Sequence, residues 1–294
     1  MYPAPFDYVR AGSYQEAAQL LHDRGENAKL IAGGQSLVPM MNLRLARPEL
    51  LIDINDVGRG AGPVLRDGWL HMPAVTRQRA LERLPAVATH APLFATAAAH
   101  TGNVRVRTRG TIGGNLAHAD PSSELSCVAV ATEAEVDVVG ADGSRRIAAT
   151  DLFITDLTTS LEQSEVIRSV EVPTRPARTG YGFAELARRA GEFAIVIAAA
   201  VVTLDELGSC QGVRLAFGGV GARIVDGSAM AAEHLVGVDP TPDRVVAAVA
   251  GTSGASSPRD DHQASAQYRS RLMAVLGGRA LRDAIAGANG ASGG

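Results

Sequence analysis

Two glycine-rich segments, residues 32–36 and 109–115, constrain this chain more than any other feature of its sequence. The first reads Ala-Gly-Gly-Gln-Ser, and the second reads Arg-Gly-Thr-Ile-Gly-Gly-Asn. Residues with little or no side chain allow backbone N–H groups to approach negatively charged oxygens, and each segment ends in a hydroxyl or an amide that can add a hydrogen bond. One such loop predicts a phosphate site, so two of them predict a pyrophosphate site.

Neither segment matches a common nucleotide-binding fingerprint. GxGxxG between a strand and a helix is missing, as is GxxxxGK[ST]; residues 218–221, Gly-Gly-Val-Gly, come nearest and lack the later lysine. A dinucleotide in a Rossmann crevice is therefore not expected. Taken alone, the first segment is read more readily as a tight turn after a strand, because most Gly-Gly pairs simply interrupt loops. The residues that follow it favour a binding role.

Composition limits the class of protein. A chain of 294 residues with 46% hydrophobic content can bury the core of one or two domains. Its net charge of −3, with both signs interspersed, argues against nucleic acid as the main partner. The two cysteines, Cys127 and Cys210, form neither a CxxC pair nor a disulfide framework. We therefore expect a reducing compartment and no metal or iron–sulfur cluster within this chain.

No targeting or membrane segment is predicted. The first residues lack the basic and apolar regions of a signal peptide, and the apolar stretch 193–204 is too short to span a bilayer. We expect a cytoplasmic protein without a transmembrane segment.

The first part of the chain reads as a small α/β unit. Ser13 and Glu16 form a capping box, whose hydroxyl and carboxylate serve free N–H groups at the start of a helix that runs to Gly25. Residues 29–32 form a short buried strand that leads straight into the first glycine segment, and residues 50–54 form a second buried strand. This order of elements predicts a parallel pair of strands.

A second unit surrounds the second glycine segment. Thr76 is expected to cap a helix that runs through Leu84, and the alanine-rich residues 91–100 predict another helix. Residues 134–140 alternate apolar and polar side chains, and the turn at 141–144 predicts a hairpin with a short return strand.

The pattern changes again after about residue 177. Residues 193–204 and 212–217 predict two strands that pair around a turn. A helix is predicted up to Gly251, with Thr241 as its cap and Pro242 in its first position, and a further helix is predicted over 262–276. The small residues at 286–294 are predicted to be a disordered tail.

Three long motifs resemble one known family. Residues 32–46 with 51–55 are similar to the first flavin loop of the FAD-binding medium subunit of aerobic carbon monoxide dehydrogenase and related molybdenum hydroxylases, the xanthine dehydrogenase family. Residues 106–121 resemble the second flavin loop, and residues 261–269 resemble the C-terminal helix. The resemblance covers nearly the whole chain and keeps the order of the motifs.

The resemblance implies an α+β fold. A two-subdomain FAD-binding domain of the vanillyl-alcohol-oxidase/PCMH type, residues 1–176, would be divided into subdomains at about 1–56 and 57–176. A small α+β C-terminal domain, residues 177–285, would contain an antiparallel sheet and helices.

The resemblance also implies which residues hold FAD. Backbone groups of both glycine segments, with the Ser36 hydroxyl, would grip the pyrophosphate, whose charges are costly to bury without N–H donors. Thr101 and Thr111 would face the adenine or the phosphates, and Glu124 would accept hydrogen bonds from ribityl or ribose hydroxyls. The implied FAD-binding set is Lys29, Leu30, Ile31, Ala32, Gly33, Gly34, Gln35, Ser36, Leu37, Thr101, Gly110, Thr111, Ile112, Gly113, Gly114, Asn115, Glu124, Val166, Ile167 and Phe193.

This chain departs from the family pattern near the expected position of the isoalloxazine ring. Relatives commonly carry a lysine there, whereas this chain has Ala184, Glu185 and Ala187. They also often carry a hydroxyl-bearing aromatic over one face of the ring, where this chain has Phe193, which can stack but cannot donate a hydrogen bond. We therefore expect altered electrostatic tuning of the flavin.

Several charged residues near the second segment keep two interpretations. Arg107 and Arg109 either add charge near the phosphates or form ordinary salt bridges. Asp120 is read more readily as an Asx-turn residue. His100 and His118 have no nucleophile or carboxylate dyad at diagnostic spacing, so no catalytic residue is predicted.

The resemblance implies an oxidoreductase subunit that works with partners. Electrons would pass from [2Fe–2S] clusters of a small subunit through FAD to an external acceptor, after substrate oxidation at molybdopterin in a large subunit. The complex would be a heterotrimer, and a dimer of heterotrimers is expected. Two alternatives remain open: a self-contained FAD-dependent oxidoreductase, and a non-catalytic adaptor whose glycine segments are merely turns.

Overall fold

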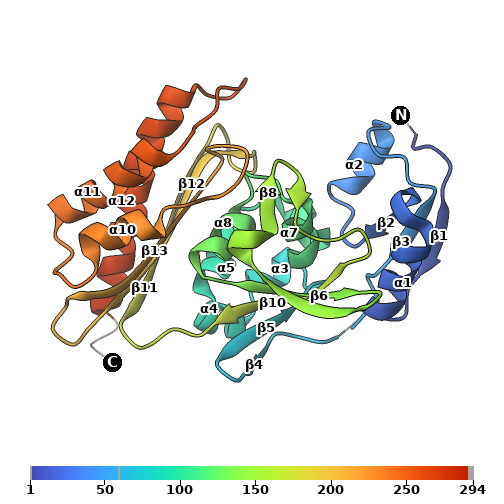
Figure 1. Cartoon of the computed structure of the whole chain (residues 1–294), viewed down its shortest axis with the longest axis horizontal. Coiled ribbons are helices and arrows are strands. Elements are labelled where there is room, and N and C mark those ends of the chain that lie inside the picture. Colours follow the sequence, from blue (N-terminus) through green and yellow to red (C-terminus); the bar gives the residue numbers. More distant parts are fainter. Residues whose placement is uncertain (1, 59, 291–294) are drawn as a thin grey trace.

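The computed structural model describes residues 2–58 and 60–290, and shows three units in a row (Figure 1). An N-terminal unit lies at one end, a central unit holds most of the short helices, and a C-terminal unit of long strands and helices lies at the other end (Figure 1). Among the described residues no helix is long and apolar enough to cross a membrane.

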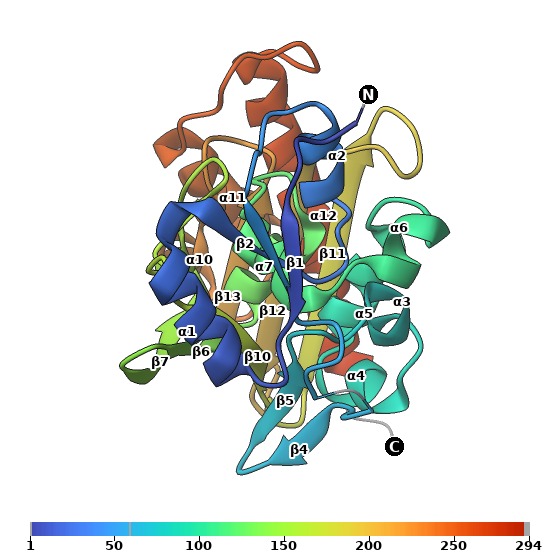
Figure 2. The ribbon, with the colours of Figure 1, turned by 90° about the vertical axis from the view of Figure 1, so that its right-hand side faces the viewer.

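The N-terminal unit is a three-stranded parallel sheet with one covering helix (Figure 2). Its strands lie in the order β1 (Asp7–Arg10), β3 (Leu50–Asp53) and β2 (Ala28–Ile31). Helix α1 (Tyr14–Arg24) is capped by Ser13, whose hydroxyl accepts from the amide of Glu16, and a 3₁₀ turn, η1 (Gly25–Asn27), follows. The predicted capping box and parallel pair are confirmed, and β1 is an additional strand.

Both glycine segments lead into short helices. The first segment runs from β2 into α2 (Leu37–Asn42), and the second runs from α6 (Val104–Arg109) into α7 (Ile112–His118). The first segment thus lies directly before a helix N-terminus, whereas Gly113 and Gly114 of the second lie in the first turn of α7.

The central unit is a five-stranded antiparallel sheet packed against helices. Its buried core joins Leu70 and Val136 of the sheet to Phe94 and Leu125 of the helices. The strands follow the order β4 (Val64–Arg66), β5 (Trp69–Pro73), β10 (Val166–Pro173), β6 (Glu135–Gly140) and β7 (Gly143–Ala148). The remaining elements are α3 (Gln78–Leu81), α4 (Pro85–His90), α5 (Pro92–His100), α8 (Glu124–Ala131), α9 (Ala149–Leu152), β8 (Phe153–Thr155) and β9 (Thr158–Thr159).

Two details of the central unit differ from the sequence prediction. Thr76 does not cap a helix: α3 begins at Gln78 after Arg77 and ends at Leu81, short of the predicted Leu84, and the Thr76 carbonyl accepts a hydrogen bond from the amide of Ile112 at 3.0 Å. The return strand of the predicted hairpin, β7, is also as long as β6. Most of its residues are polar and exposed, so the sequence lacks the alternation of apolar and polar residues by which a strand is predicted.

The C-terminal unit is a four-stranded antiparallel sheet in the order β11 (Thr179–Ala187), β12 (Ala194–Leu204), β13 (Cys210–Gly218) and β14 (Val225–Asp226). The predicted pairing of β12 with β13 is confirmed, whereas β11 was not predicted. Three helices cover one face of this sheet (Figure 1): α10 (Ser228–Leu235), α11 (Pro242–Ala255) and α12 (Ala266–Gly290).

Helix α12 corrects the prediction of a disordered tail from residue 286. The helix continues to Gly290 because its small residues pack against glycines of β11. A Cβ on Gly182 would lie 1.9 Å from the Ala280 carbonyl oxygen, and one on Gly180 would lie 2.3 Å from the Ala288 amide nitrogen. Residues 291–294 of the predicted tail lie outside the described residues.

Strand β12 joins the C-terminal unit to the rest of the molecule. Successive side chains of a strand point to opposite faces. Ile197 and Ala199 accordingly belong to the core of the central unit, whereas Val196 and Ala198 belong to the core under α12. The C-terminal sheet therefore lies between its own helices and the helices of the central unit, where it contacts α5 and α8.

Candidate functional site

The two glycine segments, far apart in sequence, are in direct contact. A Cβ built on Gly33 would lie 2.4 Å from the Arg109 carbonyl oxygen and 2.8 Å from the Gly110 Cα. No real side chain tolerates such distances, so Gly33 is required for the backbones to approach one another. The predicted meeting of the two segments is thus present in the fold.

The first segment offers free backbone donors. The first helical hydrogen bond of α2 runs from the Val38 amide to the Gly34 carbonyl, so the amides of residues 35–37 precede the helical ladder. Gly34 has a φ of 70°, a conformation that suits glycine, and Ser36 makes no side-chain cap to the helix. Its hydroxyl and the neighbouring amides are therefore available to an anion.

The second segment is held on the protein by residues 74–78. The amide of Ile112 donates to the Thr76 carbonyl at 3.0 Å, and the amide of Gly113 donates to the Ala74 carbonyl at 2.9 Å. These two amides, which the sequence analysis assigned to the pyrophosphate, are thus used within the protein. Gly114 is exposed, and its amide donates to the Thr111 hydroxyl at 3.1 Å.

These residues fit an FAD pyrophosphate. A phosphate group needs a backbone without bulky side chains, N–H or hydroxyl donors, and a helix N-terminus with partial positive charge. The first segment supplies the donors, and the second supplies the exposed backbone at Gly114 and the buried hydroxyl of Thr111. Of the flanking residues, Lys29 is exposed, whereas Leu30, Ile31 and Leu37 are half-buried.

A polar cluster lies at the start of α8. The Thr101 hydroxyl donates to the Glu124 carboxylate at 3.1 Å and to the Ala97 carbonyl at 2.9 Å. The Ser123 hydroxyl donates to the side-chain oxygen of Asn115 at 2.6 Å. The structure therefore brings Asn115 of α7 and Thr101, at the end of α5, to the start of α8.

The pKa of Glu124 is raised to about 7, chiefly by burial and also by the negative charge of Glu185, while hydrogen bonds from its own backbone amide and from the Thr101 hydroxyl oppose the rise. This carboxyl is 6% exposed. A buried acid that titrates near neutral pH is common at functional sites.

Replacing Glu124 by glutamine should flatten the dependence of stability on pH. The pKa of Glu124 in the folded protein lies above 4.5, the ordinary pKa of a glutamate side chain. The stability that its protonation contributes is therefore fully present below pH 4.5 and is lost as pH rises through about 7. The melting temperature of the wild-type protein should therefore fall, relative to that of Glu124→Gln, between pH 5 and pH 8, as calorimetry can show. Glu206→Gln, on an exposed turn, is the matched control, and parallel melting curves for wild type and Glu124→Gln would contradict the assignment.

The Glu185 side chain contacts His100. The Nδ1 atom of His100 is 3.2 Å from a carboxylate oxygen of Glu185, and the His100 ring stacks at a tilt on Phe183 with centroids 5.0 Å apart. The hydrogen bond to Glu185 raises the pKa of His100, and partial burial opposes it. The Glu185 carboxylate is thus paired with the His100 imidazole.

The structure places the other predicted residues as follows. Val166 and Ile167 are buried on β10, and Val166 packs in the same core cluster as Ala32. Phe193 is 62% exposed in the loop between β11 and β12, so its ring is free to stack on a ligand. Its place at the site stays a prediction.

Arg107 and Asp120, near the second segment, have structural roles. Arg107 donates to the carbonyls of Thr101 and Gly102, at 3.1 and 2.9 Å, and pairs with Glu82 at 3.2 Å. Asp120 accepts the amide of Ser122 at 2.8 Å in an Asx turn. The salt-bridge interpretation therefore holds for Arg107.

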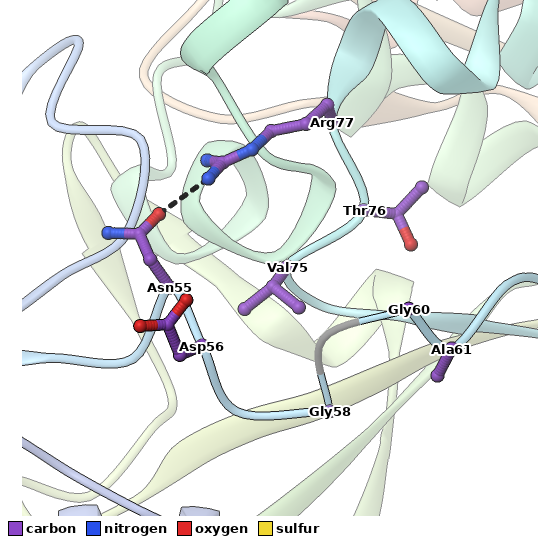
Figure 3. A pocket seen from close by; sticks show the side chains of 8 residues that line it. All are labelled: Asn55, Asp56, Gly58, Gly60, Ala61, Val75, Thr76 and Arg77. Carbon is purple, nitrogen blue, oxygen red and sulfur yellow. Dashed lines mark hydrogen bonds between the residues drawn. The ribbon is translucent and has the colours of Figure 1, made fainter.

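Sequence reasoning missed Asn55 and Arg77. They line a pocket beside the glycine segments, where the Arg77 guanidinium donates to the Asn55 side-chain oxygen at 2.7 Å (Figure 3). The remaining lining residues are Asp56, Gly58, Gly60, Ala61, Val75 and Thr76 (Figure 3). An isolated arginine after a valine-threonine pair gave no signal of this contact.

Comparison with known proteins matches the whole chain to one family. The model of the "FAD binding domain in molybdopterin dehydrogenase" matches residues 4–175, and that of the "CO dehydrogenase flavoprotein C-terminal domain" matches residues 181–284.

Curated relatives and solved structures agree with these matches. The 6-hydroxypseudooxynicotine dehydrogenase complex subunit alpha of Paenarthrobacter nicotinovorans is 38% identical over 288 residues, covering 97% of this chain and 96% of the relative. The carbon monoxide dehydrogenase medium chain of Afipia carboxidovorans is 31% identical over 290 residues, covering 97% and 99%. The structure of carbon monoxide dehydrogenase from Hydrogenophaga pseudoflava superposes with a TM-score of 0.93 at 34% identity, covering 97% of this chain and 99% of that one.

Proposed function

The chain belongs to the family of FAD-binding medium subunits of molybdenum hydroxylases, and we propose that it carries electrons from [2Fe–2S] clusters of a partner subunit to an external acceptor. It is an oxidoreductase subunit with FAD as its cofactor. The observation that carries the proposal is the direct contact between the two glycine segments at Gly33, which forms a single backbone cradle from two distant parts of the chain. When bound, FAD supplies the exchange of electrons between one-electron and two-electron carriers.

The chain's own residues bind and orient the cofactor in this proposal. The amides of residues 35–37 and the Ser36 hydroxyl donate to the pyrophosphate, and Gly114 and Thr111 close the cradle from the other side. Asn115, Glu124 and Thr101 hold the polar side chain of the flavin. The full proposed set is Lys29, Leu30, Ile31, Ala32, Gly33, Gly34, Gln35, Ser36, Leu37, Thr101, Gly110, Thr111, Ile112, Gly113, Gly114, Asn115, Glu124, Val166, Ile167 and Phe193, with Ile112 and Gly113 contributing their close backbone and not their amides.

We further propose how the chain is divided and with what it assembles. The FAD-binding domain would comprise residues 1–176, and the C-terminal domain would begin at 177, a division supported by the three separate sheets before β11. Relatives are medium subunits of multi-subunit molybdenum hydroxylases, so a molybdopterin-binding large subunit and a [2Fe–2S] small subunit are the partners. A dimer of heterotrimers in the cytoplasm would complete the arrangement.

Hydroxylase activity should therefore require the partner subunits. The isolated chain, loaded with FAD, is expected to show no turnover of an N-heterocycle or an aldehyde, because it provides no molybdenum centre at which substrate can be oxidised. The complex purified through a tag on this chain should turn over such a substrate with an artificial electron acceptor. Turnover by the isolated chain, free of iron and molybdenum, would instead favour a self-contained FAD-dependent oxidoreductase.

A further inference from the structure

One side-chain pair connects the two glycine segments to each other. The Arg77 guanidinium donates through one nitrogen to the Arg109 carbonyl at 2.6 Å and through the other to the side-chain oxygen of Asn55 at 2.7 Å. The side-chain nitrogen of Asn55 donates in turn to the Ala32 carbonyl at 2.8 Å. A chain of hydrogen bonds thus runs from the first residue of one segment to the first residue of the other.

The hydrogen bonds of Arg77 and Asn55 act at the same place where Gly33 lets the two backbones approach. The carbonyl of Arg109, which Arg77 holds, is the same atom that approaches the position of a Gly33 Cβ at 2.4 Å. Fixing this carbonyl therefore fixes how closely the two backbones approach. Ala32 is the residue immediately before Gly33, so its carbonyl orients the first segment at the same place.

Asn55 is itself held in one orientation. Asp53 accepts from the Asn55 amide at 2.7 Å and from its side-chain nitrogen at 2.6 Å, and the Tyr8 hydroxyl donates to the other oxygen of Asp53. Because the Asn55 nitrogen and oxygen are both engaged, the side-chain amide cannot rotate without losing partners. The pair is therefore preorganised before any ligand binds.

An alternative use of Arg77 is recognition of an anion in the adjacent pocket, which Arg10 and Arg109 also line. The observed geometry disfavours this role. Both terminal nitrogens of the Arg77 guanidinium already donate to protein oxygens, and its fork shape suits two acceptors at once. Arg77 thus extends towards Asn55 (Figure 3), and its other terminal nitrogen is engaged by the Arg109 carbonyl.

We propose that Asn55 and Arg77 form a brace that sets the spacing of the two glycine segments for FAD binding, so that both are positioning residues for the cofactor. This inference rests on the proposed function, because the cradle that they brace is the one assigned to the FAD pyrophosphate. The brace lowers the cost of ordering the loops at the moment of binding. Neither residue needs to touch FAD.

The test measures FAD affinity and loop mobility in the full chain. Apoprotein variants Arg77→Ala and Asn55→Ala should each raise the Kd for FAD about tenfold to a hundredfold, the effect expected when a hydrogen bond to a charged group is lost. The double variant should be no weaker than Arg77→Ala alone, because both changes break one connection. Arg77→Lys, with one donor centre in place of a fork, should give an intermediate Kd.

Hydrogen exchange in the apoprotein provides a second readout. The Val38 and Met40 amides, which donate to the Gly34 and Ser36 carbonyls of the first segment, should exchange faster in Arg77→Ala than in wild type, since that segment is no longer tied to Arg109. Arg79→Ala is the matched control: Arg79 pairs with Glu82, the residue that follows α3, and this hydrogen-bonded ion pair involves neither segment. This variant should keep the wild-type Kd and exchange rates.

The outcomes separate this inference from the proposed function. An unchanged Kd in Arg77→Ala, additive losses in the double variant, or equal losses in Arg77→Ala and Arg79→Ala would each overturn the brace. If Arg77→Ala does not fold, Arg77→Lys and Asn55→Ala decide the question by the same criteria. Failure of the wild-type chain to bind FAD would instead overturn the proposed function.

Discussion

Gly114→Asp is expected to abolish FAD retention while leaving most of the fold in place. Gly114 is exposed, and a Cβ there meets within 4 Å only the Thr111 hydroxyl, at 2.8 Å, which is the end of a side chain that can rotate. The new carboxylate would repel the pyrophosphate at short range, and its bulk would fill the position of closest backbone approach. The measurement is the flavin absorbance per purified chain.

Gly62→Asp provides the control for this variant. It adds the same side chain and charge in a position where a Cβ meets nothing within 4 Å. Its flavin content should equal that of wild type. A normal flavin content in folded Gly114→Asp would defeat the assignment of the second segment to the pyrophosphate.

Gly33→Asp should lose flavin by a different route. The sequence alone predicts that this variant folds at least partly, but the structure places the Gly33 Cα against the backbone of Arg109 and Gly110. Backbone atoms cannot move aside as a side chain can, so the two segments must separate. We therefore expect a lower melting temperature together with the loss of flavin, which distinguishes this variant from Gly114→Asp.

Glu185→Lys is expected to raise the flavin midpoint potential by some tens of millivolts. A cation near the isoalloxazine ring stabilises the anionic reduced flavin, by roughly 1–2 kcal/mol where the pair is partly desolvated. For a two-electron couple, about 30 mV corresponds to roughly 1.4 kcal/mol. Potentiometric titration of the two proteins under identical conditions measures the difference.

The contact with His100 sharpens this prediction. Loss of the Glu185 carboxylate removes the hydrogen bond that raises the pKa of His100, so His100 should lose its proton more readily in the variant. Part of the added positive charge is thereby cancelled near neutral pH, and the rise in potential should be larger at low pH. Glu206→Lys makes the same charge change on an exposed turn and should leave the potential unaltered. An unchanged or lower potential in Glu185→Lys would show that Glu185 does not face the ring, or that a cation such as Arg188 already holds it.

Local sequence signals predicted the elements that depend on neighbouring residues. The capping box at Ser13, the parallel pair β2 and β3, and the long strand β12 follow from caps and apolar runs, and the structure contains all of them. Strand β11 escaped prediction because Gly180 and Gly182, which pack against α12, interrupt the apolar run by which a buried strand is recognised. The end of α12 also escaped prediction. Its small residues are typical of a disordered tail, and only their packing against Gly180 and Gly182 keeps them helical.

The candidate site was only partly predictable for a similar reason. The glycine segments are recognisable from their composition, and their contact at Gly33 agrees with the prediction that both serve one site. The occupation of the Ile112 and Gly113 amides by residues 74–76 depends on tertiary packing, which no local pattern encodes. The same holds for the Asn55–Arg77 pair and for the pairing of His100 with Glu185, because each joins residues from separate elements.

The flavin, iron and molybdenum content of the complex purified through a tag on this chain tests the central claim most directly. We predict about one FAD for each copy of the chain, with molybdenum and iron carried by copurifying larger and smaller subunits. In the same purification, Gly114→Asp should retain the metals and lose the flavin. A wild-type chain that is free of flavin, or one that carries flavin but copurifies with neither metal, would contradict the account.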